Sequence, residues 1–335
     1  MIKSVIFGCG GLVLKREEVK FFSSVNPWGF ILFKRNIENP TQLRALTDSI
    51  RNTVGRDIPI LIDQEGGRVE RLSKPHWRSW MPAMEQMSLV PEELSDRAMW
   101  LRYRIIGEEL KTVGIDVNCA PIGDLANSFT HSVLLNRCYG KTPDVVIRAA
   151  KACASGLLES GVLPVLKHLP GHGRAKVDSH LDLPKISATR NDLSKSDFVV
   201  FKNLNDIPLG MTAHILYEDL DNKLPATQSK KIIEIVRTEL KFNGLLMTDD
   251  LSMKALTGTF EDKVKKALKA GCDLILHSNG NMAEMDEISQ FCGSLSPERN
   301  KFSDMVLRKR KTSSSIDIQK LINEYDVIID NISLI

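Results

Sequence analysis

The segment LPVLKHLPGHGRAKVDSH, residues 163–180, begins as an apolar run and ends as a loop crowded with ionisable side chains. The run stops at Lys167 and His168, after which proline and glycine exclude a helix. The pattern predicts a buried β-strand that ends in two polar residues and continues as a flexible loop.

Seven further short aliphatic runs are bounded by turn residues, and amphipathic stretches with helical spacing lie between them. The eight runs are residues 4–8, 29–34, 58–63, 114–121, 163–168, 208–214, 244–250 and 272–278. The amphipathic stretches include residues 41–54, 93–113, 144–160, 229–241 and 261–271. Eight strands that alternate with helices over the length of one domain predict a (β/α)8 barrel.

Several of these runs are apolar until their last residues and then end in a reactive side chain. These terminal residues are Asp63, Lys167 with His168, His214, and Asp249 with Asp250. In a barrel, the C-terminal ends of the strands converge on one face, where active sites are built. A doubly wound sheet gives the same alternation, but residues 7–11 (FGCGG) lack the Gly-x-Gly-x-x-Gly pattern that would support it.

The C-terminal region differs from the repeating pattern. We assign residues 1–295 to the catalytic barrel and residues 296–335 to a helical extension packed on it, because residues 316–335 have the pattern of an amphipathic helix. The basic run at 306–311 (VLRKRK) is typical of a solvated face and does not indicate nucleic-acid binding.

The composition is that of an ordinary globular protein. Its 335 residues are 42% hydrophobic, and 45 basic against 42 acidic residues give a net charge of +3, so neither nucleic acid nor an anionic membrane is indicated as a partner. Six cysteines without a Cys-x-x-Cys pair suit reduced thiols, and no segment has the ~20 apolar residues of a membrane span. We therefore expect a soluble protein of the cytoplasm, and we also expect it to be a monomer.

Asp249 is the strongest candidate for covalent chemistry. Because side chains alternate along a strand, Asp249 and Asp250 are expected to face opposite ways, one toward the barrel mouth and one toward its wall. An alternative is that the pair begins a helix as its N-cap, which suits Asp250 better than Asp249.

Residues 63–72 (DQEGGRVERL) place acids and arginines around a Gly-Gly turn directly after a strand. Carboxylates and guanidinium groups together satisfy the donors and acceptors of a hydroxyl-rich substrate. A loop of surface salt bridges would have the same composition, so the segment alone leaves both interpretations open.

The segment 168–180, which carries His168, His172 and His180 and is called the histidine loop below, has three interpretations. His168, His172 and His180 could bind a metal, although the intervening proline and glycines prevent the helical spacing of a chelating pair. The histidines could also serve only as hydrogen-bonding loop residues. In the third interpretation, Asp178 orients His180 and raises its basicity, so that the imidazole acts as a general acid and base.

Five segments together resemble the β-N-acetylglucosaminidases of glycoside hydrolase family 3, in particular the compact cytoplasmic type of peptidoglycan recycling. They read DQEGGRVERL, GIDVNCAPIGDL, KHLPGHGRAKVDSH, GMTAHILY and LLMTDDLSM. The resemblance covers most of the chain, and the KH-x-PGHG block with DSH is its most specific part.

The resemblance implies a set of site residues. It makes Asp249 the nucleophile and His180 the acid/base, with Asp178 as the partner of His180. It assigns sugar contacts to Asp63, Arg71, Arg137, Lys167 and His168. The match at Arg137 is loose, because the segment NRCYG departs from the family's DRSFG-like sequence, and APIGDL departs from APVLDL while keeping Asp124.

The resemblance also implies an activity, which is the removal of terminal β-1,4-linked GlcNAc with retention of configuration and without a metal or other cofactor. The expected substrate is GlcNAc-1,6-anhydroMurNAc, with or without its stem peptide. Rival interpretations are substrate-assisted catalysis by the acidic pair, phosphorolysis in place of hydrolysis, and a sugar-binding barrel that has lost catalysis.

Overall fold

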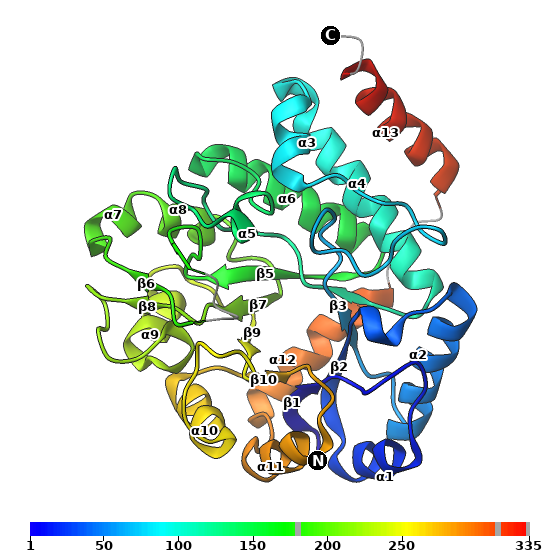
Figure 1. Ribbon diagram of the computed structural model, residues 1–335, viewed down its shortest axis with the longest axis vertical. Helices are drawn as coiled ribbons and strands as arrows, with labels where there is room; N and C mark the ends of the chain where they lie inside the picture. The colour runs from blue at the N-terminus through cyan, green and yellow to red at the C-terminus, as the bar shows by residue number, and fades with distance from the viewer. Residues whose placement is uncertain (178–181, 312–315, 333–335) are drawn as a thin grey trace.

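The computed structural model of the protein describes residues 1–177, 182–311 and 316–332. Among these residues, eight parallel strands close into a barrel in the order β1-β10-β9-β7-β5-β4-β3-β2 (Figure 1). The strands are β1 (Lys3–Phe7), β2 (Pro27–Leu32), β3 (Ile60–Ile62), β4 (Val117–Asn118), β5 (Leu163–Leu169), β7 (Leu209–Thr212), β9 (Leu245–Asp250) and β10 (Leu274–His277). Each lies within or overlaps one of the predicted runs, and the predicted (β/α)8 barrel is confirmed.

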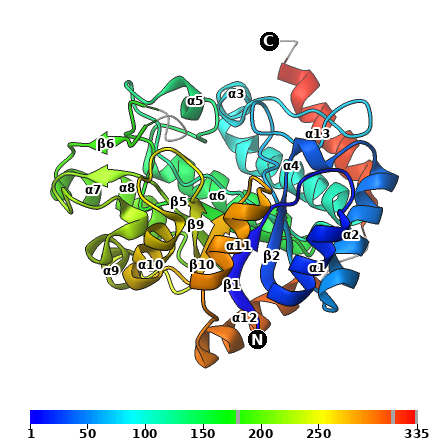
Figure 2. The same cartoon turned by 60° about the horizontal axis from the view of Figure 1, so that its bottom comes forward.

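Helices surround the barrel (Figures 1 and 2). Those that follow the predicted stretches are α2 (Pro40–Val54), α4 (Glu92–Thr112), α6 (Pro143–Glu159), α9 (Lys230–Thr238) and α10 (Phe260–Ala270). The others are α1 (Arg16–Val25), α3 (Ala83–Leu89), α5 (Ser132–Leu135), α7 (Arg190–Ser194), α8 (Asp197–Lys202), α11 (Met282–Phe291), α12 (Pro297–Arg308) and α13 (Ile318–Ile332). A two-stranded sheet outside the barrel, β6 (Lys185–Ile186) with β8 (Leu216–Tyr217), was not predicted, because two-residue strands leave no periodic signal.

The alternation of side chains along the strands divides the core into two layers. One set of buried side chains fills the barrel, including Ile6, Ile31, Leu61, Val117, Val165, Met247 and Leu274. The other set packs the outside of the strands against the helices, including Val5, Phe30, Ile60, Leu166, Leu246 and Ile275. The barrel is therefore solid below its mouth, which leaves the C-terminal strand ends for a site.

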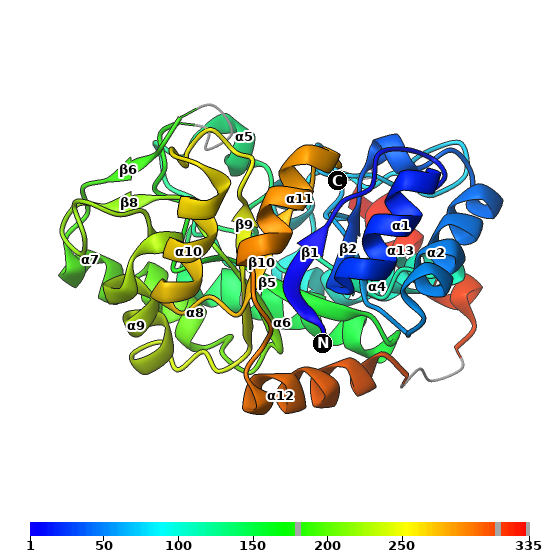
Figure 3. The ribbon, with the colours of Figure 1, turned by 90° about the horizontal axis from the view of Figure 1, so that it is seen from below.

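The C-terminal helices lie in two different places. Helix α12 crosses the N-terminal end of the barrel (Figure 3), where Trp28 Nε1 on β2 donates to Ser303 Oγ at 2.7 Å. Helix α13 lies beside α4, and the Arg97 guanidinium pairs with Glu324 at 2.7 Å. The boundary at residue 296 between a barrel and an extension stays a prediction.

No helix in the described parts of the chain is both long enough and apolar enough to span a membrane. The thiols of all six cysteines are buried and unpaired.

Candidate active site

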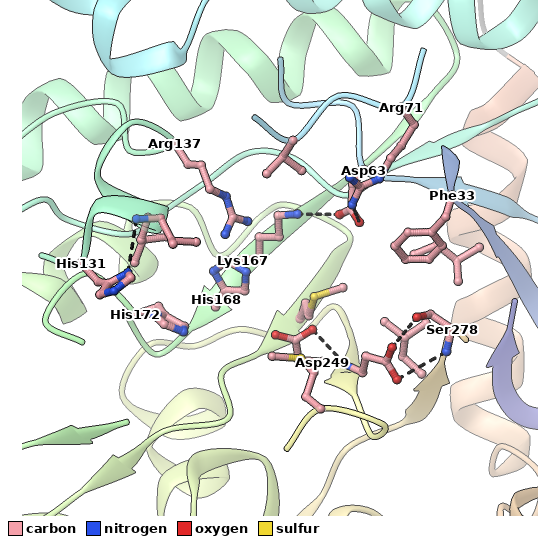
Figure 4. A pocket seen from close by; sticks show the side chains of 18 of the residues that line it. Phe33, Asp63, Arg71, His131, Arg137, Lys167, His168, His172, Asp249 and Ser278 are labelled. Atoms are coloured by element: carbon pink, nitrogen blue, oxygen red, sulfur yellow. Dashed lines mark hydrogen bonds and ion pairs between the residues drawn. The ribbon is translucent and has the colours of Figure 1, made fainter. Parts of the chain in front are cut away.

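A cavity of about 270 Å³ opens at the C-terminal ends of the strands. Its lining includes the predicted nucleophile and all five predicted sugar-contacting residues, namely Asp63, Arg71, Arg137, Lys167, His168 and Asp249. Figure 4 shows Asp63, Arg71 and Arg137 on one side of this cavity and Asp249 and Ser278 on the other. The volume lies slightly below the ~300–1,000 Å³ of most ligand pockets, which suits one sugar unit better than a long chain.

Two of these side chains, Lys167 and His168, lie on an irregular stretch of strand β5. Its pairing with β7 shifts register between Leu166 and Leu169, so that Lys167 and His168 lie in a bulge. A bulge re-aims side chains out of the regular alternation and is common beside active sites. Both residues line the cavity, although neighbours on a regular strand would face opposite sides.

Charged groups from two loops and β5 form one buried cluster. Lys167 Nζ lies 2.8 Å from Asp63 Oδ1 and 2.7 Å from Glu65 Oε1. Arg137 binds both oxygens of Glu65, with Nη2 to Oε1 at 2.8 Å and Nε to Oε2 at 2.9 Å. Arg71 Nη2 donates to Asp63 Oδ2 at 3.1 Å, and its guanidinium lies 5.0 Å from the ring centre of Phe33.

The cluster keeps its members charged. Burial alone would raise the pKa of Asp63, but the charges of Lys167 and Arg71 outweigh it and hold the pKa below its usual value. Burial likewise opposes ionisation of Glu65, but Arg137 and Lys167 lower its pKa to about 2. The pKa of Lys167 is raised, because Asp63 and Glu65 outweigh the opposing effect of burial. These groups therefore present fixed charged donors and acceptors to a ligand at neutral pH.

Glu65 is a site residue that was not singled out from the sequence. Its side chain is only 3% exposed, and it joins Lys167 to Arg137, which come from distant parts of the chain. Glu70, in the same loop, instead accepts a hydrogen bond from the backbone nitrogen of Trp80 at 2.9 Å. The only available signal was the early position of Glu65, two residues after the end of the strand run.

Asp124 organises the two histidines at the start of the histidine loop. Its Oδ2 lies 2.7 Å from His168 Nδ1, and its Oδ1 accepts from the backbone nitrogen of His172 at 2.6 Å. An ionised carboxylate only accepts hydrogen bonds, so the proton of this pair belongs on His168 Nδ1. Burial lowers the pKa of His172 to about 4, and the neighbouring His168 contributes to the same shift. His172 is therefore neutral near pH 7.

We predict that the Asp124→Asn variant loses less stability on acidification than the wild type does. Burial alone would raise the pKa of Asp124, but the charge and hydrogen bond of His168 lower it from 3.8 to about 2. Because the folded pKa is the lower one, the stabilisation is complete above pH 4–5 and disappears as the pH falls toward 2. That shift corresponds to about 2 kcal/mol, of which roughly half should be lost by pH 3.

The measurement is the free energy of unfolding in urea at several pH values for the wild type and the variant. The free energy of unfolding of the wild type should exceed that of Asp124→Asn by less as the pH falls. A constant difference from pH 7 to pH 2 would contradict the prediction. Asp206→Asn, in the exposed turn after α8, controls for the loss of one negative charge.

The two acidic residues at the end of β9 are engaged differently. Both line the cavity, so the expectation that one of them faces the barrel wall is not confirmed. Asp249 Oδ1 accepts from the backbone nitrogen of Asp250 at 2.8 Å. The Asp250 carboxylate accepts from the hydroxyl of Ser278 and from the backbone nitrogen of Ser252, the latter at 2.9 Å. The N-cap alternative is wrong, because turns follow β9 and the N-cap of the next helix, α10, is Thr259.

His214, also predicted at a strand end, does not line the cavity. Its Nδ1 lies 2.7 Å from Thr227 Oγ1 and its Nε2 lies 3.0 Å from the backbone oxygen of Asp250. Burial lowers the pKa of this imidazole, so a neutral ring that donates from Nε2 is the state that fits these contacts. His214 thus fastens the backbone next to Asp249.

The first half of the histidine loop is more tightly packed than its glycines suggested. A Cβ on Gly173 would lie 1.9 Å from the Leu125 carbonyl oxygen, and the Gly173 oxygen accepts from Thr130 Oγ1 at 2.5 Å. Here glycine permits close backbone approach instead of freedom of movement. Asp178 and His180 lie outside the described residues.

The described residues include no group of three or more histidine, cysteine, aspartate or glutamate side chains that could hold a metal ion. His168 and His172 lie close together, with ring centres 5.3 Å apart, but His168 Nδ1 is taken by Asp124. The third histidine of the metal interpretation, His180, lies outside the described residues.

Known proteins resemble this chain along most of its length. It is 35% identical over 287 residues to a beta-hexosaminidase of Alkalilimnicola ehrlichii, a match that covers 83% of this chain and 81% of that protein. It is 34% identical over 281 residues to a beta-hexosaminidase of Pseudomonas aeruginosa, with 82% of each chain covered.

Solved structures agree with these relatives. NagZ from Neisseria gonorrhoeae, in complex with N-trifluoroacetyl-D-glucosamine, superposes with a TM-score of 0.83 at 26% identity and covers 98% of this chain and 97% of its own. A family 3 β-N-acetylglucosaminidase from Paenibacillus also gives 0.83, at 29% identity, and this chain spans 66% of that longer one. The sequence model of the glycosyl hydrolase family 3 N-terminal domain matches residues 10–309. The chain therefore belongs to glycosyl hydrolase family 3, and it is a glycosidase.

Proposed function

We propose that this protein is a retaining exo-β-N-acetylglucosaminidase. It removes terminal β-1,4-linked GlcNAc from peptidoglycan fragments such as GlcNAc-1,6-anhydroMurNAc, with or without the stem peptide. The observation that carries the proposal is the convergence of Asp249 and the cluster around Lys167 on one cavity of sugar size.

The charged cluster suits the hydroxyl groups of a single terminal sugar. Lys167 and Arg71 donate hydrogen bonds, and Asp63 accepts them, from positions fixed by their mutual ion pairs. Because these side chains are already ordered, a sugar binds without the entropic cost of immobilising them. Apolar side chains of Met211, Met253 and Leu276 line the same cavity and suit the less polar face of a pyranose.

The proposed reaction has two steps. In the first, Asp249 attacks the anomeric carbon, the bond to the leaving oxygen breaks, and His180 gives that oxygen its proton. In the second, water attacks the same carbon, the bond to Asp249 breaks, and the proton of the water passes to His180. Asp178 keeps the imidazole of His180 oriented and basic through both steps.

The geometry of β9 favours this route over substrate-assisted catalysis. That mechanism needs a second carboxylate beside the first to orient the acetamido group. Asp250, which also lines the cavity, already accepts hydrogen bonds from the backbone nitrogen of Ser252 and the hydroxyl of Ser278, so its carboxylate is less available to orient an acetamido group. A covalent intermediate on Asp249 is the consequence that separates the two routes.

The proposed function is tested by hydrolysis of 4-nitrophenyl β-N-acetylglucosaminide beside the matching β-glucoside. We expect turnover of the first and far less of the second, and no activity on the first would overturn the proposal. Product analysis with and without inorganic phosphate distinguishes GlcNAc from GlcNAc 1-phosphate, and only the latter would indicate a phosphorylase. Binding of GlcNAc without turnover would indicate a sugar-binding barrel.

The natural substrate, the cytoplasmic location and the monomeric state belong to the same proposal. The unpaired state of all six thiols suits a reducing compartment such as the cytoplasm. Release of GlcNAc from purified anhydro-muropeptides, with and without the peptide, tests the substrate, and sedimentation tests the monomer.

A further inference from the structure

A row of buried polar groups runs from the C-terminal helix to the back of the active site. Tyr325 Oη on α13 donates to Gln86 Oε1 at 2.8 Å, and Arg102 Nη1 on α4 donates to the same oxygen at 2.8 Å. Arg102 Nη2 then donates to the backbone oxygen of Glu65 at 2.5 Å. Gln86 and Arg102 are completely buried, Tyr325 is 2% exposed, and none of the three lines the cavity.

The turn that follows Glu65 is formed directly against this row. A Cβ on Gly66 would lie 2.0 Å from Arg102 Nη2, and Gly66 has a φ of +95°, which favours glycine. Tyr103 Oη adds a second, longer contact to the Glu65 oxygen at 3.4 Å. The backbone of Glu65 is therefore fixed from behind by Arg102, whose own position depends on Gln86.

The side chain of Glu65 points the other way, into the charged cluster of the site. It holds Lys167 Nζ at 2.7 Å and the Arg137 guanidinium at 2.8 Å, and both cations line the cavity. A displacement of the Glu65 backbone would consequently move both cations relative to a bound sugar. Small errors in the placement of such groups are costly for an enzyme.

We propose that Arg102, Gln86 and Tyr325 are positioning residues that act through Glu65 on sugar binding. Helix α13 thereby contributes to substrate affinity from outside the cavity. This inference rests on the proposed function, because it takes Lys167 and Arg137 to contact the sugar.

The test compares two substitutions at Gln86 that have nearly the same size. Gln86→Met removes the oxygen that accepts from both Arg102 and Tyr325, whereas Gln86→Glu retains an acceptor there. For Gln86→Met we expect KM for the nitrophenyl β-N-acetylglucosaminide to rise roughly 2- to 30-fold, with the Kd for free GlcNAc rising in parallel. The change in kcat should stay within about twofold, because lost sugar contacts weaken ground-state and transition-state binding alike.

Gln86→Glu should restore KM to within about twofold of the wild type. Tyr325→Phe removes only the hydrogen bond from α13 to Gln86 and should raise KM in the same direction by a smaller factor, which keeps the test decisive if Gln86→Met does not fold. Thr47→Val is the matched control. Thr47 lies on α2, and its buried hydroxyl donates to the backbone oxygen of Val113 at 2.8 Å. Neither residue lines the cavity. Thr47→Val should lower Tm and leave KM unchanged.

The inference is overturned if every variant of the pair Gln86→Met and Tyr325→Phe that folds keeps the wild-type KM and Kd, or if Gln86→Glu loses as much affinity as Gln86→Met. A wild-type protein that neither hydrolyses the nitrophenyl substrate nor binds GlcNAc would instead overturn the proposed function, and the inference with it.

Discussion

Replacement of Asp249 by alanine is expected to lower kcat for GlcNAc release by roughly 10⁴- to 10⁶-fold, because a covalent route loses the group that forms its intermediate. KM should change much less, since the cluster of Lys167, Asp63 and Arg71 that is proposed to bind the sugar does not include Asp249. The measurement is single-turnover and steady-state kinetics on the nitrophenyl β-N-acetylglucosaminide. Asp249→Asn, which keeps the shape of the side chain, should lose a similar factor.

A 5-fluoro glycosyl donor identifies the nucleophile directly. Mass spectrometry of the inactivated protein should find the sugar on the peptide that carries Asp249, and Asp249→Ala should carry no label. Asp250 is the informative neighbour, because its carboxylate accepts from Ser252 and Ser278 within the protein. Label on Asp250, or no label together with full inhibition by an oxazoline analogue, would contradict the assignment.

The sequence was sufficient for the barrel and for the positions of its strand-end residues. Asp63 and Asp249 follow apolar runs that predict buried strands, and both line the cavity at the strand ends, although Asp250 lines it as well. Such information is local, since it depends on residues within one strand. The closure of the barrel then brings these ends together without any further signal in the sequence.

The contacts between segments could not be predicted in the same way. Glu65 and Glu70 belong to the same short loop, yet only Glu65 meets Lys167, because that meeting depends on how the loop after β3 lies against β5. Asp124 was noted only as a residue kept in a motif. Its role in fixing His168 depends on a separation of 44 residues along the chain.

The glycines of the histidine loop illustrate a different difficulty. Gly171 and Gly173 suggested flexibility, but Gly171 has a φ of +138° and Gly173 packs against the Leu125 backbone. Glycine serves mobile loops and close packing equally well, and composition does not distinguish the two. The expectation that Asp178 orients His180 as a general acid and base concerns residues outside the described part, and it stays a prediction.

Replacement of His180 by alanine is expected to harm catalysis in proportion to the need of the leaving group for a proton. A sugar alcohol leaves poorly, so the disaccharide substrate should lose roughly the 10²- to 10⁴-fold typical of general acid catalysis. Nitrophenolate leaves unaided, so its release in the first step should suffer far less and should produce a burst before slow hydrolysis of the intermediate. Asp178→Asn should give a weaker version of the same pattern, because it removes only the charge that supports the imidazole.

His172 is the matched control for this experiment, because it is a histidine of the same loop, it lines the cavity, and burial lowers its pKa to about 4. A neutral imidazole with so low a pKa is a poor proton donor at pH 7, so His172→Ala should affect both substrates equally. Equal losses on both substrates for His180→Ala would mean that His180 binds sugar or supports the loop. If His172→Ala alone showed dependence on the leaving group, the general acid would be His172, and its pKa would have to rise when substrate binds.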